Sequence, residues 1–334
     1  MIGIVILTFR SSDVIEACLD SLPFDTEPGL RVVLCDNASD DDTVGIIRTW
    51  AGTTGRNLEE HYVGSPKMRA DTGPLTLLHT GGNLGFAGGV NIGLIHLLRD
   101  PDIDLFWILN PDCEVTPGAA AAYRERAAKA APFALMGGRI CYREAPGLIQ
   151  SDGGRVYRWS GICSNINQNL MPDAAVFPPE ESLDFISGAN MVASRLFIER
   201  TGPMVEDYFL YYEEIDWASR RGDLPLLFCP EATVYHVGGT TIGTGSANRR
   251  PSPFANFFNY RNRMRYMWRF HRSRLPTAWA LSMLRVGKLA AIGAWDEAWA
   301  AFAGLHGLPP PAGVRYVIAP VDHDRAFKLK DRTR

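Results

Sequence analysis

The N-terminal part of the chain alternates short apolar runs with segments whose apolar side chains recur at helical spacing. Residues 2–9, "IGIVILTF", are rich in β-branched side chains and have the length of one buried strand, and residues 30–39 form a similar run. Residues 11–22 and 40–50 have the three- and four-residue periodicity of helices. This β-α-β-α opening predicts an α/β fold with a mainly parallel sheet and right-handed crossovers.

The same alternation continues further along the chain. Further strands are predicted at residues 75–79, 104–112 and 133–142, and helices at about 87–98 and 117–131. A Gly-rich turn precedes the first of these helices, and the second is rich in Ala. Each added strand–helix pair extends the same sheet, so we expect a Rossmann-like sheet flanked by helices.

Two segments interrupt this regular pattern. Residues 51–73 are polar and Gly-rich and predict a surface excursion. The Gly, Asn and Pro content rises again over residues 146–182, where we expect shorter strands and loops. Regular structure resumes at "FISGANMVASRLFIERTG" (185–202), and a helix ended by Gly222 and a strand at 226–239 follow.

The character of the chain changes after residue 250. From Phe254 the sequence is helical, basic and aromatic, and residues 275–305 are rich in Trp and Ala. We therefore predict two regions, an α/β domain over residues 1–250 and a mainly helical C-terminal appendage over residues 251–334.

Composition excludes several classes of protein. Of 334 residues, 46% are hydrophobic and 21% are charged, which is globular, and the net charge of −3 argues against bulk binding of nucleic acid. The N-terminal apolar run is too short for a signal peptide and lacks a basic leader, and an 18-residue uncharged apolar run is absent. The six cysteines are scattered without a CxxC pair, which predicts buried free thiols in a reducing, cytoplasmic compartment.

Polar residues end four of the predicted strands. These strand ends are Thr8-Phe9-Arg10, Asp36-Asn37, Gly81-Gly82-Asn83 and Asn110-Pro111-Asp112. In open parallel sheets, ligands bind at the carboxyl ends of the strands. If the four strands are parallel and adjacent, these residues line one crevice.

Each of the polar motifs has a structural and a chemical interpretation. "GGNLGFAGGVNIG" is either a tight strand-to-helix turn or a phosphate site at a helix N-terminus, and it is neither a Rossmann fingerprint nor a P-loop. Asn110-Pro111-Asp112 is either a turn or a corner where Asp112 binds Mg²⁺ or Mn²⁺ together with a diphosphate. His236 is either structural or a second metal ligand.

Three acids follow an aromatic cluster in "FLYYEEIDWASRR". Glu213, Glu214 and Asp216 are either a favourable start to a solvated helix or a general base walled by aromatic side chains. Burial among apolar groups raises the pKa of a carboxyl group and suits it to take a proton near neutral pH. The surrounding Phe and Tyr residues favour the second interpretation.

Taken together, these motifs resemble the family 2 glycosyltransferases of the GT-A fold, and within them the rhamnosyltransferase-like and galactofuranosyltransferase-like members. The resemblance covers about residues 2 to 245, with the motifs in the family's order and spacing. It is carried by "VILTFR", "VVLCDNASDDDT", "GGNLGFAGGVNIG", "WILNPDCEVTPGA", "FISGANMVASRLFIERTG", "DYFLYYEEIDWASRRG" and "PEATVYHVGGTT".

The resemblance implies a metal site and a nucleotide-sugar pocket. Asp112 and His236 match the family's ligands for Mg²⁺ or Mn²⁺. Asn110 replaces the first acid of the family's motif, and it either contacts the ribose or sugar or only shapes the turn. The residues implied for nucleotide-sugar binding are Thr8, Arg10, Asp36, Asn37, Asn83, Gly85, Asn110, Asp112, Gly188 and Ala189. Arg10 stands where the family more often has Asn, so it either alters the nucleotide contacts or meets the phosphates.

The resemblance also implies an inverting single displacement, in which a base takes the proton of an acceptor hydroxyl. Glu213-Glu214 matches the family's acidic pair, whose second member is usually the base, so Glu214 is expected in that role with Glu213 and Asp216 as alternatives. Rhamnose from dTDP-rhamnose is the first expectation for the donor, and UDP-sugars the next. A growing polysaccharide, a lipid-linked oligosaccharide and a protein glycan remain open as acceptors.

The basic, aromatic C-terminal region leaves three interpretations open. It is a helix packed on the catalytic domain, a surface that contacts the inner face of a membrane peripherally, or a homodimer interface. The residues expected to insert into lipid are Trp268, Trp279, Trp295 and Trp299. Family members often use lipid-linked acceptors, which agrees with the second interpretation.

Two rival functions were weighed on the residues. A nucleotidyltransferase needs a basic, Gly-rich phosphate loop near the N-terminus, and "LTFRSSDVIEA" lacks one. A non-catalytic nucleotide-sugar-binding protein on the same fold would be expected to lose Asp112 or all of Glu213, Glu214 and Asp216, and all four are present. The sequence therefore favours an enzyme.

Overall fold

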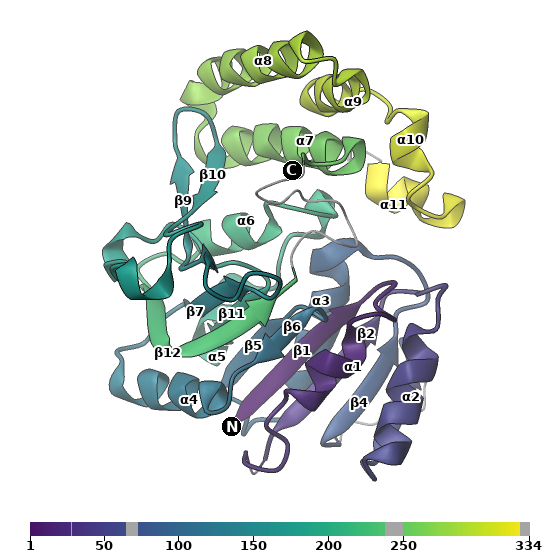
Figure 1. Ribbon diagram of the computed structural model, residues 1–334, viewed down its shortest axis with the longest axis vertical. Helices are drawn as coiled ribbons and strands as arrows, with labels where there is room; N and C mark the ends of the chain where they lie inside the picture. Colours follow the sequence, from purple (N-terminus) through teal and green to yellow (C-terminus); the bar gives the residue numbers. More distant parts are fainter. Residues whose placement is uncertain (28, 65–72, 238–249, 328–334) are drawn as a thin grey trace.

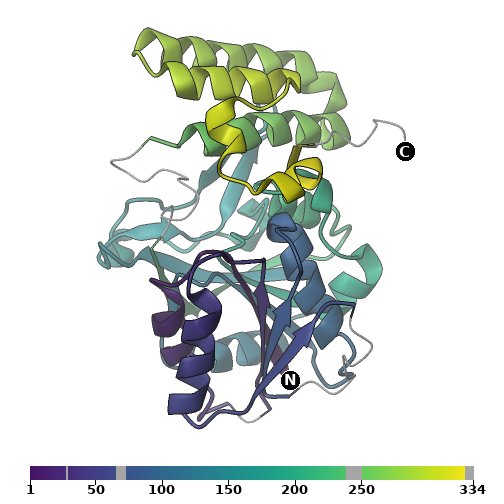
Figure 2. The same cartoon turned by 90° about the vertical axis from the view of Figure 1, so that its right-hand side faces the viewer.

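In the computed structural model, a large twisted sheet occupies one half of the molecule with helices on both faces, and three long C-terminal helices lie beyond one end of it (Figures 1 and 2). The structure describes residues 1–27, 29–64, 73–237 and 250–327. The glycines and threonines that follow His236 in the "VYHVGGTT" motif, and residues 65–72 of the predicted excursion, lie outside this part.

The ten-stranded sheet has a parallel half and a mixed half. In spatial order its strands are β3 (Leu58–Tyr62), β4 (Leu75–His79), β2 (Arg31–Asp36), β1 (Ile2–Thr8), β5 (Leu105–Leu109), β11 (Asn190–Ser194), β7 (Leu135–Tyr142), β12 (Leu226–His236) and β6 (Cys113–Val115), with β8 (Ile149–Ser151) beside β7. The first five strands in this order, β3, β4, β2, β1 and β5, are all parallel. Strand β11 is antiparallel to both its neighbours, and β12 is parallel to β7. A separate hairpin joins β9 (Gly154–Tyr157) and β10 (Ile162–Asn165).

Alternate side chains of each central strand enter two different cores. In β1, Ile4 and Ile6 belong to one buried cluster and Val5 belongs to the other. Because both faces of the strand are covered, β1 is a continuous apolar run rather than an alternating one. The same division separates Trp107 from Phe106 in β5.

Helices cover both faces of the sheet. The helices are α1 (Ile15–Asp20), α2 (Thr43–Thr53), α3 (Gly85–Leu97), α4 (Ala119–Lys129), α5 (Arg195–Thr201), α6 (Glu213–Ser219), α7 (Pro253–Phe270), α8 (Leu275–Ala291), α9 (Trp295–His306), α10 (Ala312–Arg315) and α11 (His323–Phe327). Helices α1, α2 and α4 contribute to the cluster of Ile4, and α3, α5 and α6 to the cluster of Val5. Short 3₁₀ turns lie at Pro172–Ala174, Glu180–Ser182, Glu206–Tyr208, Arg272–Arg274 and Pro320–Asp322.

Three elements differ from the sequence prediction. The first helix is only α1, because residues 11–14 form a turn in which the Ser11 carbonyl accepts from Val14 and Ile15. Helix α3 begins two residues earlier than expected, at Gly85. The segment 51–73 contains the edge strand β3, whose polar side chains gave no strand signal because this strand is only half-buried.

The C-terminal helices share a core with the sheet domain. Ser252 caps α7 by accepting from the Ala255 amide at 3.1 Å, and Pro253 occupies the first turn. Phe254 and Phe258 then pack in one buried cluster with Phe209. The boundary at residue 250 stays a prediction, but side chains from both sides of it are buried together.

The six cysteines are all free, and five of them are buried. Among the described residues, no helix combines the length and the apolar character that crossing a bilayer requires.

Candidate active site

The carboxyl ends of the parallel strands meet at one cavity of about 310 Å³, a volume within the range of small-molecule sites. Thr8 lies opposite Asp36, and Asp36 lies opposite His79, so the polar ends of β1, β2 and β4 are adjacent. The prediction that these strand ends converge is confirmed. The sequence-predicted residues that line the cavity are Arg10, Asn37, Asn83, Gly85, Asn110, Asp112, Gly188, Ala189, Glu213, Glu214 and His236.

Thr8, Asp36 and Asp216 were also predicted, but they lie behind the cavity wall rather than among its lining residues. The Thr8 side chain is fully buried, with its hydroxyl 3.4 Å from Asp36 Oδ1. Asp36 Oδ1 also accepts from the Ser39 amide at 3.3 Å. In this structure Asp36 holds the loop after β2.

Asn37 holds the Gly-rich turn in place. Its Nδ2 donates to Asn83 Oδ1 at 3.0 Å and to the Gly85 carbonyl at 3.2 Å, while its Oδ1 accepts from the Leu84 amide at 2.9 Å. The Gly85 amide donates to Asn83 Oδ1 at 3.0 Å, and the Phe86 amide donates to the Phe209 carbonyl at 2.7 Å. Three N–H groups at the start of α3 are therefore already bonded to protein, which favours the turn interpretation over a phosphate site.

Gly85 also lies close to the backbone of Phe209, in the loop that precedes α6. Its φ of +72° is left-handed, and a Cβ at this position would lie 2.2 Å from the Phe209 carbonyl oxygen. Only glycine fits both conditions.

Arg10 lies at the rim of the cavity. Its φ is +51°, and its guanidinium makes a two-point ion pair with Asp40 at 2.6 and 2.7 Å. The side chain is thereby turned toward the loop after β2. The charge of Arg10 is thus paired within the protein, and its part in nucleotide or phosphate binding stays a prediction.

Asp112 and His236 form a corner where β5 and β12 end. His236 Nε2 lies 3.1 Å from Asp112 Oδ1 and 3.3 Å from the side-chain amide of Asn110. On the other side of the ring, Nδ1 lies 2.8 Å from Gln150 Oε1. The contact with Gln150 fixes the orientation of the imidazole ring, so that Nε2 faces the carboxylate of Asp112.

This donor set fits a hard divalent cation. Asp112, Cys113 and His236 place one potential ligand atom each within 4.8 Å of one another. Mg²⁺ and Mn²⁺ favour carboxylate and imidazole over sulfur. The Cys113 thiol instead donates a hydrogen bond to the Ala189 carbonyl oxygen, 3.3 Å away. The ligands offered are therefore Asp112 and His236. Gln150, which orients the imidazole, was missed because its position in a loop-rich segment carries no motif.

Glu213 and Glu214 face the cavity from the first turn of α6. Glu213 is 3% exposed, and its Oε2 has no hydrogen-bond partner among the described residues. Burial, with the adjacent Glu214 charge adding to it, raises the pKa of Glu213 well above its usual value. Burial raises the pKa of Glu214 to about 7. Carboxyl groups whose pKa values are raised by burial in a cavity are typical of acid–base sites.

Asp216 is committed to a structural network. Its carboxylate accepts from the Tyr208 hydroxyl at 2.8 Å, from Arg220 Nε at 2.9 Å and from Arg269 Nε at 3.1 Å, and it is fully buried. These contacts tie α6 to the preceding loop and to α7. The geometry leaves Glu213 and Glu214 as the acids able to meet a ligand.

The loop that carries these acids has an unusual backbone. Phe209, Tyr211 and Tyr212 have φ values of 63°, 68° and 75°. Left-handed backbone costs about 1–2 kcal/mol for each such residue, and it persists only where the surroundings determine it.

A clamp from α7 stabilises this loop. Asn262 Nδ2 lies 2.8, 2.6 and 3.0 Å from the carbonyls of Tyr208, Leu210 and Tyr211. The neighbouring Arg261, 3% exposed, donates to the Tyr208 carbonyl at 2.8 Å and to the Ala326 carbonyl at 2.6 Å. Sequence reasoning missed both residues, because nothing distinguishes them from the other polar residues in "NYRNRMRY". It also missed the C-terminal residues that line the cavity, which are Phe254, Val317 and Ile318.

The stretch after residue 186 serves both the cavity and the core. Gly188 and Ala189 line the cavity. The Asn190 side chain turns inward, where its Oδ1 accepts from Trp107 Nε1 at 2.8 Å and from the Tyr123 hydroxyl at 2.9 Å. This stretch therefore contributes both to the lining of the cavity and to the packing of the core.

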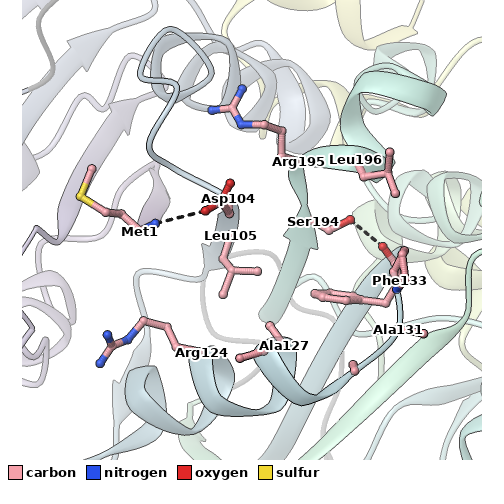
Figure 3. A pocket seen from close by; sticks show the side chains of 13 residues that line it. Met1, Asp104, Leu105, Arg124, Ala127, Ala131, Phe133, Ser194, Arg195 and Leu196 are labelled. Atoms are coloured by element: carbon pink, nitrogen blue, oxygen red, sulfur yellow. Dashed lines mark hydrogen bonds and ion pairs between the residues drawn. The ribbon is translucent and has the colours of Figure 1, made fainter.

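A larger cavity of about 550 Å³ lies at the opposite, amino ends of the parallel strands, where β1 and β5 begin (Figure 3). Its wall is largely alanines of α4 and the residues after it. Arg195 donates to the carbonyls of Leu98 and Ile103, and the Met1 amino group pairs with Asp104 at 3.5 Å. These charged groups thus already have partners within the protein. The candidate catalytic and metal-binding residues line the smaller cavity.

Comparison with known proteins places the chain among glycosyltransferases. The model of glycosyl transferase family 2 matches residues 3–180, more than half of the chain. An N-acetylglucosaminyl-diphospho-decaprenol L-rhamnosyltransferase of Mycobacterium tuberculosis is 25% identical over 269 residues, 74% of this chain and 80% of that protein. The low-salt glycan biosynthesis hexosyltransferase Agl10 of Haloferax volcanii is 23% identical over 270 residues, 78% of this chain and 74% of that protein.

A solved mannosyltransferase from Pyrobaculum calidifontis, in complex with GDP-Man and Mn²⁺, has a TM-score of 0.51 to this structure at 15% identity, covering 91% of this chain and 85% of that one. This likeness confirms the predicted GT-A fold, and the sequence relatives confirm a transferase. The chain belongs to glycosyl transferase family 2.

Proposed function

We propose that the protein transfers a sugar from a nucleotide sugar to an acceptor hydroxyl with inversion at the anomeric carbon. One observation supports this most strongly: Glu214, with a pKa raised to about 7, lines the same cavity as the Asp112–His236 corner. A base and a cation site that line one cavity match the two needs of a displacement at a sugar carbon.

Asp112 and His236 are the residues proposed to hold Mg²⁺ or Mn²⁺. When bound, the ion offsets the charge that develops on the departing nucleoside diphosphate. Gln150, 2.8 Å from Nδ1 of His236, is proposed to hold the ring with Nε2 directed at the site. Asn110, whose amide lies beside the same nitrogen, is proposed to shape the corner rather than to replace an acid.

Glu214 is proposed as the general base. It takes the proton of the acceptor hydroxyl as that oxygen bonds to the anomeric carbon, and the bond from that carbon to the diphosphate oxygen breaks with its electron pair. Glu213, whose pKa burial raises well above its usual value, is proposed to offer a hydrogen bond to a hydroxyl of either sugar.

The proposed donor is dTDP-rhamnose, with a UDP-sugar as the alternative, and the proposed acceptor is a lipid-linked glycan. This choice is supported by the name of the 25% identical relative, which contains both rhamnose and a decaprenol diphosphate. Asn37, Asn83 and Gly85 on one wall are assigned to the donor, and Gly188 and Ala189 to the transferred sugar.

The test is Glu214→Gln, with Glu125→Gln on the exposed face of α4 as the matched control. A positioned general base contributes roughly 10²–10⁴-fold, so the variant should lose nearly all turnover while keeping a thermal shift with nucleotide and Mn²⁺. Retention of more than about a tenth of the wild-type rate, a loss of only about 1.4 kcal/mol, would rule out this role.

The donor is identified by the thermal shift itself, measured with dTDP, UDP, GDP and their sugars, with and without Mn²⁺. A ligand at 100 times its Kd adds about 2.7 kcal/mol of stability. Asp112→Asn should remove the metal-dependent part of the shift. If no nucleotide shifts the wild type, the proposed donor site is wrong.

A further inference from the structure

The two outermost helices of the molecule expose a row of large apolar side chains. Helices α8 and α9 lie outside α7, on the side away from the sheet (Figures 1 and 2). We call the outer face the set Trp279, Leu284, Ile292, Trp295 and Trp299, whose exposed fractions are 44%, 71%, 56%, 68% and 55%. These values exclude core packing as their explanation.

The inward face of the same helices already has its core. Val286, Ala298, Ala301 and Leu305 are buried against Tyr260 of α7. The outer face is therefore additional to what folding requires. On α9, Trp295 and Trp299 are four residues apart and lie on one side of the helix, and Trp299 stacks on Phe302 at 5.6 Å. Trp279 of α8 joins this row by donating to His306 at 3.2 Å.

The charges on α8 and on the turn before it are all basic, since residues 272–291 contain no acid. Helix α9 has two acids, Asp296 and Glu297, in its first turn. Helix α8 itself carries only Arg285 and Lys288 as charged residues, and both are exposed. The preceding turn adds Arg272, which lies over the Trp268 ring at 3.8 Å.

We propose that the outer face of α8 and α9 docks on an anionic lipid bilayer. Trp side chains favour the boundary between headgroups and acyl chains, and exposed Arg and Lys are attracted to anionic headgroups. An amphipathic helix pair with Trp and Leu beside basic residues has the character of a surface-lying membrane contact.

The docking surface is continuous in the chain with the cavity. The helices lead through α10 to Val317 and Ile318, which line the cavity, and the flanking Tyr316 and Val321 are almost fully exposed. Membrane docking rests on the proposed function only for its role in the reaction, which is to bring a lipid-linked acceptor to the rim of the cavity at Val317 and Ile318. Membrane binding itself is independent of catalysis.

The experiment is co-sedimentation of the full-length protein with vesicles of phosphatidylcholine alone and with added phosphatidylglycerol. We expect sedimentation with the anionic vesicles only, weakening as salt is raised. Trp295→Ala/Trp299→Ala and Arg285→Glu/Lys288→Glu should each weaken binding by at least about tenfold. The control is Met171→Ala/Val176→Ala, which removes exposed apolar side chains from a different region.

Nucleotide-dependent thermal shift, measured on every variant, separates this proposal from the proposed function. Unchanged shifts with lost vesicle binding support membrane docking. Wild-type protein that stays in the supernatant with anionic vesicles, or Trp variants that sediment like wild type, would overturn it. A concentration-dependent dimer that the Trp variants abolish would also overturn it, by giving the outer face to a second copy.

Discussion

The two walls of the cavity are built in different ways. The wall of Asn37 and Asn83 is held by hydrogen bonds among loops that directly follow adjacent parallel strands. The wall of Glu213 and Glu214 is held by a loop with three left-handed residues, which Asn262 fastens from a helix some 50 residues further along the chain. The first wall is a product of the sheet, and the second exists only when the C-terminal helices are in place.

This difference has a consequence for how each wall responds to change. A damaged strand-end loop still has its neighbouring strands, whereas the acidic loop without its clamp has unsatisfied carbonyls and strained backbone. We therefore expect changes to the clamp to affect turnover more than donor binding, and changes to the strand ends to do the reverse.

The largest effect is expected at Gly85, where the two walls touch. Gly85→Ala adds a Cβ 2.2 Å from the Phe209 carbonyl oxygen and puts alanine at a φ of +72°. Strain and backbone displacement together should cost about 3 kcal/mol or more, measured by urea unfolding. Gly52→Ala is the control, because its Cβ meets no atom within 4 Å and an alanine within α2 should stabilise by about 0.5–1 kcal/mol. Equal behaviour of the two variants would show that the walls do not meet here.

Asn262→Ala tests how far the wall of Glu213 and Glu214 depends on the contact from α7. It removes the Asn262 donor from the carbonyls of Leu210 and Tyr211, while the Tyr208 carbonyl keeps Arg261, so a loss of about 2–3 kcal/mol in unfolding free energy is expected. Turnover should fall while nucleotide-dependent thermal shift is retained.

Asn259→Ala is the matched control for this clamp, since its amide bonds only within the same helix, to the Ala255 carbonyl. It should change the unfolding free energy by less than about 1 kcal/mol. If the Asn262 and Asn259 variants have equal turnover, Asn262 has no part in positioning the acids.

Asn37→Ala tests the other wall. It removes the donor to Asn83 and the acceptor for the Leu84 amide, which should cost about 1–3 kcal/mol of stability. Because the Gly-rich turn would loosen, the KM for the donor should rise more than kcat falls. A drop in kcat alone, with the KM for the donor unchanged, would contradict the assignment of this wall to the donor.

The smallest effect is a pH dependence. Burial raises the pKa of Glu214 from its usual value to about 7, so between about 4.5 and 7 the folded state binds more protons than the unfolded state. The contribution of Glu214 to the free energy of unfolding should therefore fall as pH rises through this window and level off above it. Over the same range kcat/KM should rise, because the base must lose its proton.

Glu214→Gln separates these two pH effects from the rest of the protein. The unfolding free energy of the variant should fall less steeply between pH 5 and 8 than that of the wild type, although Glu213 still contributes a fall of the same sign. A wild-type kcat/KM profile that is flat from pH 5 to 8 would contradict the proposed base.

Much of this architecture could be predicted from the sequence. Strands buried on both faces, such as β1 and β5, are continuous apolar runs, and polar residues mark the places where they end. The Asn110-Pro111-Asp112 corner and the Glu213-Glu214 pair were found in the same way, and both line the cavity. The half-buried strand β3 was missed because its polar side chains resemble a loop.

Residues that act across long distances in the chain could not be predicted. Asn262 and Gln150 are ordinary polar residues until folding brings them to the acidic loop and to His236. Asp216 has the same sequence signal as Glu213, and only its pairing with Arg220 and Arg269 removes it from the cavity.

By itself, the sequence determined the order of strands and helices and the chemistry available at the strand ends, because side-chain periodicity and turn residues act over a few positions. The tertiary structure alone decided which acids face the cavity, which groups hold them there, and which tryptophans remain exposed on α8 and α9. These outcomes depend on contacts between segments far apart in the chain, and such contacts leave no local pattern.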